Sequence, residues 1–130
     1  MPTERPARRI EDVLANITAI ESYTGGLTKD AFACNRMAVD AVERCLERIS
    51  EAARKLGEQF DSRVPDDVDL ASVRRFGSVL RHDYDAVDTD ILWNVVTLRL
   101  PALKTAFEKL EAEHPLPAKD TETDFDPFRS

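Results

Sequence analysis

Residues 38–60, AVDAVERCLERISEAARKLGEQF, decide the fold of this chain. Apolar residues recur there every three or four positions, which is the period of one face of an α-helix, and most of the charged residues fall between them. The pattern predicts one long amphipathic helix over about residues 29–60, with Thr28 as its N-cap. The predicted buried face consists of Ala38, Val42, Cys45, Leu46, Ile49, Ala53, Leu56 and Phe60.

The same period occurs before this stretch and after it. The first occurrence runs from Ile10 to Tyr23, with Tyr23 at the edge of the core, and Gly25-Gly26 should end that helix because glycine readily takes the left-handed conformation. Polar turn residues and a proline over residues 61–67 predict a loop, and a third helix should follow over about residues 69–84.

The fourth predicted helix begins at Asp88 or Thr89, both good N-caps, and runs to His114 at its C-terminal end. Pro101 should kink it, because proline has no N–H to donate to the carbonyl of Thr97. Trp93 is expected to pack in the core or at a dimer interface, since a lone aromatic on an amphipathic helix normally packs. The predicted apolar face comprises Ile91, Leu92, Val95, Val96, Leu100, Leu103, Phe107 and Leu110.

Four amphipathic helices joined by short connections predict an all-α fold, an antiparallel up-down four-helix bundle. The bundle should occupy residues 1–114 as one domain, followed by an acidic, proline-containing tail over residues 115–130 that is mobile or docked on a partner. We expect a homodimer, because small helical domains often bury leftover apolar surface against a second copy.

Composition restricts the partners and the compartment. The 130 residues include 18 Lys and Arg against 25 Asp and Glu, a formal net charge of −7, so any RNA contact must be local. No apolar run approaches the ~20 residues that a membrane span needs. Cys34 and Cys45 are about 16 Å apart if both lie in one helix, too far for a disulfide, which favours a cytoplasmic location.

Common cofactor motifs are missing from the sequence. The segment TGGLTK over residues 24–29 lacks the spacing of a phosphate-binding loop. His82 and His114 have no cysteine or second histidine at ligand spacing, so we expect neither a metal site nor another cofactor.

One polar face of the third predicted helix carries residues suited to chemistry. Arg75, Ser78 and His82 stand at i, i+3 and i+7, and therefore line up. A histidine can transfer protons near pH 7 and an arginine can stabilise a developing negative charge, which together suit metal-free cleavage of RNA by its own 2′-hydroxyl. Gly77 would let another backbone or a ligand come close. The alternative is that Arg75 and His82 only solvate the helix or pair with carboxylates.

Arg75, six intervening residues and then His82-Asp83-Tyr84 resemble the R-x(4–6)-H-x-Y motif of the HepT-like branch of the HEPN superfamily. Trp93 and the segment Leu100-Pro101-Ala102-Leu103 follow the motif as they do in that family. The resemblance covers about residues 10–110.

The resemblance implies a HEPN-like homodimer that acts as the toxin of a toxin–antitoxin pair. Such a toxin is a metal-independent endoribonuclease, and Arg75 and His82 of both subunits would face a shared cleft, supported by Ser78, Arg74 and Arg81. Many relatives carry asparagine or another polar residue at the position of Ser78. Serine reaches less far, so the nuclease efficiency of this protein is expected to differ from that of those relatives.

The resemblance also implies a regulatory partner, a minimal nucleotidyltransferase antitoxin (MntA-like). That enzyme would transfer AMP from ATP to the motif tyrosine, Tyr84 here. Two readings compete with the toxin: a non-catalytic helical accessory subunit that presents substrate to a nucleotidyltransferase, and a dimeric scaffold. Neither has an evident need for Arg75 and His82 on one helix face.

Overall fold

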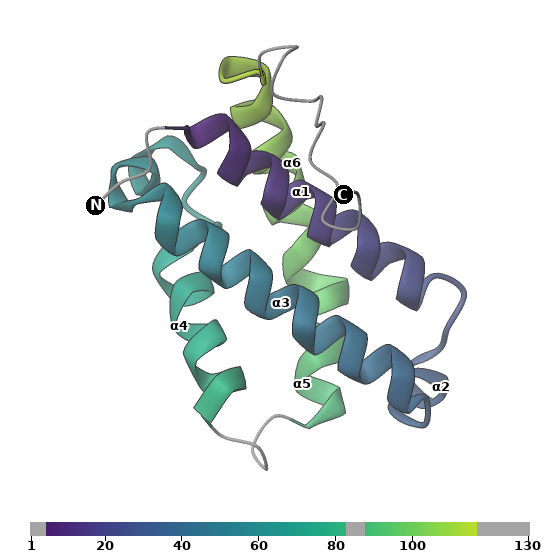
Figure 1. Cartoon of the computed structure of the whole chain (residues 1–130). Coiled ribbons are helices and arrows are strands. Elements are labelled where there is room, and N and C mark those ends of the chain that lie inside the picture. The colour runs from purple at the N-terminus through teal and green to yellow at the C-terminus, as the bar shows by residue number, and fades with distance from the viewer. Residues whose placement is uncertain (1–4, 83–87, 117–130) are drawn as a thin grey trace, which may run out of the picture.

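The computed structural model describes residues 5–82 and 88–116, with only the backbone of His82, and every regular element in these ranges is helical (Figure 1). A 3₁₀ helix, η1, and a π-helical turn, η2, interrupt the α-helices. In chain order the elements are α1 (Pro6–Thr24), α2 (Lys29–Ala33), α3 (Arg36–Leu56), η1 (Glu58–Arg63), α4 (Leu70–His82), α5 (Thr89–Asn94), η2 (Val95–Arg99) and α6 (Leu100–Glu113).

The long helices form the predicted antiparallel bundle. Helix α3 lies at its centre and contacts α1, α4 and α5, while α1 also packs along α6 (Figure 1). The chain runs one way along α1, returns along α3, and reverses again from α4 to α5 and α6. The all-α bundle is therefore confirmed. Within the described residues, no helix is long and apolar enough to cross a membrane.

The core consists of the apolar faces that the sequence predicted. All eight residues of the predicted stripe over residues 38–60 are buried. Helix α1 adds Ile10, Val13, Ile17 and Ile20. Tyr23 is an exception, because its side chain is 45% exposed and the neighbouring Thr24 is buried instead. Trp93 is half-buried and packs on Phe32 with 5.3 Å between ring centroids, as expected for a packing residue.

The single helix predicted over residues 29–60 is wrong, because the structure divides it into three. Thr28 caps α2 as predicted, accepting a hydrogen bond from the Ala31 N–H. The helix then ends at Ala33, and Asn35 starts α3 by accepting a hydrogen bond from the Ala38 N–H at 3.0 Å. Cys34 therefore lies between two helices, not in one helix with Cys45.

A glycine ends α3. Gly57 has a φ of 97°, which lies in the region that favours glycine, and the chain continues into η1. Residues 61–63 therefore belong to a 3₁₀ helix, not to the loop that their polar composition predicted. The turn after α1 follows the prediction, since Gly25 caps that helix and Gly26 has a φ of 80°.

The fourth predicted helix starts as expected but contains a π turn. Asp88 caps α5 by accepting a hydrogen bond from the Ile91 N–H at 3.0 Å. The sequence predicted a kink at Pro101 within one helix; the structure instead has the π turn η2 before the proline, in which the Leu100 N–H bonds to the carbonyl of Val95, five residues back. Pro101 then sits in the first turn of α6, where no N–H is needed.

The π turn changes how two core residues line up. Leu92 and Leu100 are both buried, and positions eight apart in an uninterrupted α-helix lie about 80° apart around the axis, near the two edges of one apolar face. A π turn absorbs one extra residue and brings the two nearly into line. Ile91, which the sequence assigned to this face, is 44% exposed.

Candidate active site

Helix α4 starts with a chain of hydrogen bonds that ends on Arg75. Asp69 accepts hydrogen bonds from the Ser72 N–H at 3.2 Å and from the Ser72 hydroxyl at 2.7 Å. The hydroxyl in turn accepts a bond of 2.9 Å from Nη2 of Arg75. The bonds from Ser72 hold the pKa of Asp69 below its usual range. Arg75 is exposed, and within the described residues no carboxylate pairs with it.

A close approach between two helices fixes α4 in place. Gly77 is buried, and a Cβ added there would clash with the side chain of Ser50 on α3. The Ser50 hydroxyl donates a hydrogen bond of 2.8 Å to the carbonyl oxygen of Arg74. The close approach predicted at Gly77 is thus made by α3.

The arginines of α4 lie on two different flanks. Arg74 donates two hydrogen bonds to Asp61 of η1, at 3.1 and 2.7 Å, and its side chain is only 14% exposed. These bonds raise the pKa of Arg74. Arg81 follows seven residues later on the same flank, and its guanidinium lies beside Gly77 near α3. Arg75 is roughly 100° around the helix from Arg74. The structure therefore separates Arg75 from the two arginines expected to support it.

Two other predicted site residues share the side of Arg75. Ser78 is exposed one turn after Arg75, and His82 is the last residue of α4, seven positions after Arg75. The side chain of His82 lies outside the described residues, and so does the whole of Tyr84. His114 caps the end of α6 as predicted, with its backbone N–H bonded to the carbonyl of Leu110.

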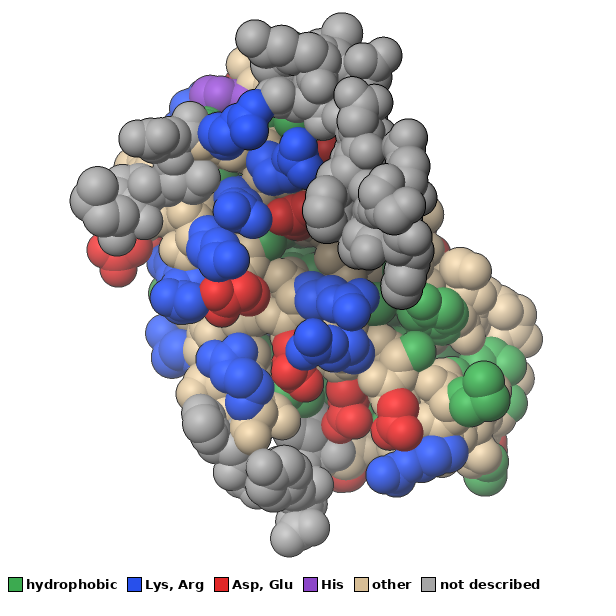
Figure 2. Space-filling model, in the orientation of Figure 1, with side chains coloured by type: hydrophobic (Ala, Val, Ile, Leu, Met, Phe, Trp, Pro, Cys, Tyr) green, Lys and Arg blue, Asp and Glu red, His purple; other side chains and the backbone are tan. Residues whose placement is uncertain are grey.

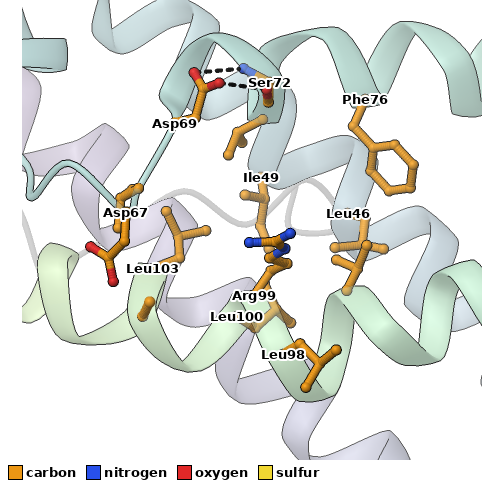
Figure 3. A pocket seen from close by; sticks show the side chains of 14 residues that line it. Leu46, Ile49, Asp67, Asp69, Ser72, Phe76, Leu98, Arg99, Leu100 and Leu103 are labelled. Carbon is orange, nitrogen blue, oxygen red and sulfur yellow. Dashed lines mark hydrogen bonds between the residues drawn. The ribbon is translucent and has the colours of Figure 1, made fainter.

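A groove of about 470 Å³ runs between α4 and the segment formed by η2 and α6 (Figure 3). Its floor is Leu46 and Ile49 of α3, and its α4 wall includes Ser72 and Phe76. Arg99 projects into it from the opposite wall, and Asp67 and Asp69 lie at one end (Figure 3). Arg75 is not one of the lining residues, but it is bonded to the hydroxyl of Ser72, which is.

The sequence reasoning missed both the groove and Arg99. No sequence signal located the π turn, because buried residues eight apart also occur in the uninterrupted helix α3, at Cys45 and Ala53.

The surface around α3 carries more Lys and Arg side chains than the groove does, but several of them are paired with carboxylates. Figure 2 shows Lys and Arg side chains gathered on the face around α3, with Asp and Glu among them. Pairs such as Arg44 with Glu47 and Arg54 with Glu51 occupy much of that charge. Among the residues that the structure describes, no three His, Cys, Asp or Glu side chains are arranged to hold a metal ion.

Comparisons with known proteins show the family of this chain. Residues 13–110 match the family model described as "Ribonuclease HepT-like". A Thermococcus cleftensis protein named "Probable ribonuclease HepT" is 34% identical over 101 residues, covering 78% of this chain and 91% of the relative. A "Putative RNase" of Methanocaldococcus jannaschii is 31% identical over 101 residues, covering 78% and 83%. No solved structure matches significantly. The chain therefore belongs to the HepT-like ribonuclease family, as the motif from Arg75 to Tyr84 implied.

Proposed function

We propose that this protein is the toxin of a toxin–antitoxin pair and a metal-independent endoribonuclease that uses Arg75 and His82. The observation that carries the proposal is the exposure and the hydrogen bonding of the Arg75 side chain. Its guanidinium is exposed, is oriented by Ser72, and has no carboxylate partner in the described part of the chain. An arginine held in this way offers its donors to a phosphate.

The chemistry needs no cofactor, because RNA supplies its own nucleophile. The 2′-hydroxyl attacks the adjacent phosphorus, its proton goes to a base, and the departing 5′-oxygen takes a proton from an acid. Arg75 stabilises the negative charge that grows on the phosphate oxygens. His82 transfers protons, and the second histidine that an acid–base pair needs comes from the other subunit.

The homodimer in this proposal places two copies of Arg75 and His82 at one cleft. Exposed apolar side chains support it, since Val79 lies on α4 between Arg75 and His82 and is 43% exposed. Leu98 of η2, at the edge of the groove, is 68% exposed. Apolar area left open beside the site is the kind that a second copy buries.

The proposed regulator is a nucleotidyltransferase antitoxin that AMPylates Tyr84. Tyr84 follows His82 by two residues in the sequence. An added AMP brings a negative phosphate and a bulky nucleotide beside the cations that bind RNA, so it blocks and repels the substrate. Intact-mass measurement after incubation with ATP and the antitoxin should show added AMP on the unmodified sequence and none on Tyr84→Phe.

The second candidate function is a non-catalytic accessory subunit of a nucleotidyltransferase. The apolar groove favours it, because a cavity of about 470 Å³ with few polar groups is of ligand-binding size. This role predicts that replacing Arg75 leaves the activity of the partner nucleotidyltransferase unchanged.

RNA cleavage in the presence of EDTA separates the two functions. The purified protein should cleave unmodified RNA, while Arg75→Ala and His82→Ala lose at least 100-fold in rate, the usual contribution of such groups. Arg36→Ala is the matched control, because this arginine is 87% exposed at the start of α3, away from the groove. Intact RNA with every variant, together with equal growth of cells that express them, would contradict the nuclease.

A further inference from the structure

The π turn decides where Arg99 lies. The π turn η2 lies between the buried residues Leu92 and Leu100, and its last three residues, 97–99, are exposed while Val95 and Val96 still pack against the core. Leu98 and Arg99 are exposed, and both line the groove. Irregular turns of this kind inside helices are frequent at functional sites.

Arg99 carries an unneutralised charge. It makes no ion pair with any described residue, and its guanidinium projects toward the α4 wall between Ser72 and Phe76 (Figure 3). Arg75 belongs to that same stretch of α4 and reaches Ser72 at 2.9 Å. Arg99 therefore enters the groove from one wall, and on the other wall Ser72 is bonded to Arg75; neither arginine is within ion-pair distance of a carboxylate in the described part of the chain, although Asp69 is close enough to Arg75 to interact with its charge.

The groove is also polarised along its length. Asp67 and Asp69 lie at one end, while Phe76 and Leu98 lie at the other, with Arg99 between them (Figure 3). Asp69 stays negatively charged, because the bonds from Ser72 lower its pKa. A polyanion is repelled at the acidic end, so it should leave the arginines on the side of Phe76 and Leu98.

We propose that Arg99 binds a phosphate of the RNA substrate next to the phosphate that Arg75 stabilises, and so sets how the strand crosses the groove. This inference rests on the proposed nuclease function and adds a substrate-binding residue to it. Arg99 binds and positions the strand and takes no part in proton transfer. A phosphate suits this position better than a neutral ligand, because Arg99 is the cationic side chain in the described lining and the carboxylates of Asp67 and Asp69 lie toward the other end of the groove (Figure 3).

Two measurements test this inference. The first is the salt dependence of binding to a 2′-O-methyl oligoribonucleotide, which cannot be cleaved. Arg99→Ala should weaken binding roughly tenfold and lower the slope of log K against log salt by about 0.7, the value for one phosphate contact on a single strand. Arg99→Lys should keep the slope, because the charge remains.

The second measurement is cleavage kinetics on unmodified RNA. Arg99→Ala should raise KM roughly tenfold and leave kcat within about twofold, whereas Arg75→Ala should lower kcat. Arg36→Ala again serves as the matched arginine control and should change neither KM nor the salt slope. Light scattering on each variant should give the same mass as the unmodified protein.

The outcomes separate this inference from the proposed function. An unchanged salt slope in Arg99→Ala, with RNA still cleaved, overturns the role of Arg99 and leaves the nuclease in place. A protein that binds the 2′-O-methyl strand through Arg99 but never cleaves RNA overturns the nuclease alone. Failure to bind the strand at all overturns both, and a change of mass in Arg99→Ala assigns the residue to a subunit interface instead.

Discussion

Ser50 on α3 donates a hydrogen bond of 2.8 Å to the carbonyl oxygen of Arg74 on α4, one turn from the position where Gly77 leaves room for the Ser50 side chain. This contact sets the rotation of α4 on α3. With α4 in this rotation, Arg74 pairs with Asp61, and Arg75 is exposed and bonded to Ser72, a residue of the groove. The direction in which the candidate site faces therefore depends on one glycine and one serine outside it.

Replacing Gly77 with alanine should destabilise the fold by about 1–3 kcal/mol, because the added Cβ overlaps the Ser50 side chain and α4 must move. Urea unfolding measures the loss, and Ser78→Ala on the exposed side of α4 is the control, expected within about 0.5 kcal/mol. Adding Ser50→Gly should restore part of the stability. Strictly additive effects of the two changes would contradict the contact.

Breaking the ion pair between Arg74 and Asp61 should lower the free energy of unfolding more than breaking a solvent-exposed ion pair does. Arg74 is 14% exposed and makes two bonds to Asp61, so Asp61→Asn should lower the free energy of unfolding by about 1 kcal/mol or more. The control is Asp40→Asn, since its partner Arg36 is 87% exposed and such pairs contribute ~0–1 kcal/mol. Equal losses in the two variants would contradict this difference.

The pKa of Asp69 should rise when its hydrogen-bond donor is removed. Hydrogen bonds from the Ser72 hydroxyl and N–H lower this pKa, because they stabilise the charged carboxylate of the folded protein. Their contribution to the free energy of unfolding is fully present above the usual Asp pKa of ~3.9. It is lost as the pH falls through the lowered pKa. In Ser72→Ala the carboxyl should titrate at higher pH, as NMR of the Asp69 side chain would record. Ser62→Ala is the control and should leave that titration where it was.

The two cysteines should differ in reactivity. Cys34 is exposed after α2, whereas Cys45 is buried, and burial raises the pKa of its thiol despite the opposing charge of Arg48. A thiol reagent should label one cysteine rapidly in the folded protein and the second only after denaturation. Cys34→Ser should abolish the rapid phase. Two rapid phases of equal amplitude would show that the interior around Cys45 opens readily.

Charges placed on the exposed apolar residues beside the site should weaken the proposed dimer. Val79→Glu and Leu98→Glu put carboxylates on side chains that are 43% and 68% exposed, so the monomer fold should survive. Sedimentation should then record a shift from dimer toward monomer. Met37→Glu, at a residue that is 84% exposed near the start of α3, is the control and should not change the mass. A monomeric unmodified protein would contradict the dimer itself.

The sequence predicted most of the helices because their signals are local. The stripe from Ala38 to Phe60, the caps at Thr28 and Asp88, and the glycines after α1 all act within a few residues, and the structure has each of them. Periodicity missed the break at Asn35, because a helix that resumes after two residues keeps a similar apolar pattern. It also missed the π turn, because Leu92 and Leu100 fit one apolar face of a regular helix as well.

For the candidate site, too, the sequence predicted the local features and missed those that depend on packing. Helical spacing put Arg75 and His82 on one face of a predicted helix, and the motif from Arg75 to Tyr84, followed by Trp93 and the segment Leu100-Pro101-Ala102-Leu103, pointed to the family. Spacing along α4 did not show that Arg74 would pair with Asp61, that Ser72 would orient Arg75, or that Arg99 would project into the groove. The bond between Ser72 and Arg75 is local, three residues apart in α4, and competes with many other local pairings; the Arg74–Asp61 pair and the position of Arg99 in the groove exist only once η1, α4 and η2 have packed together.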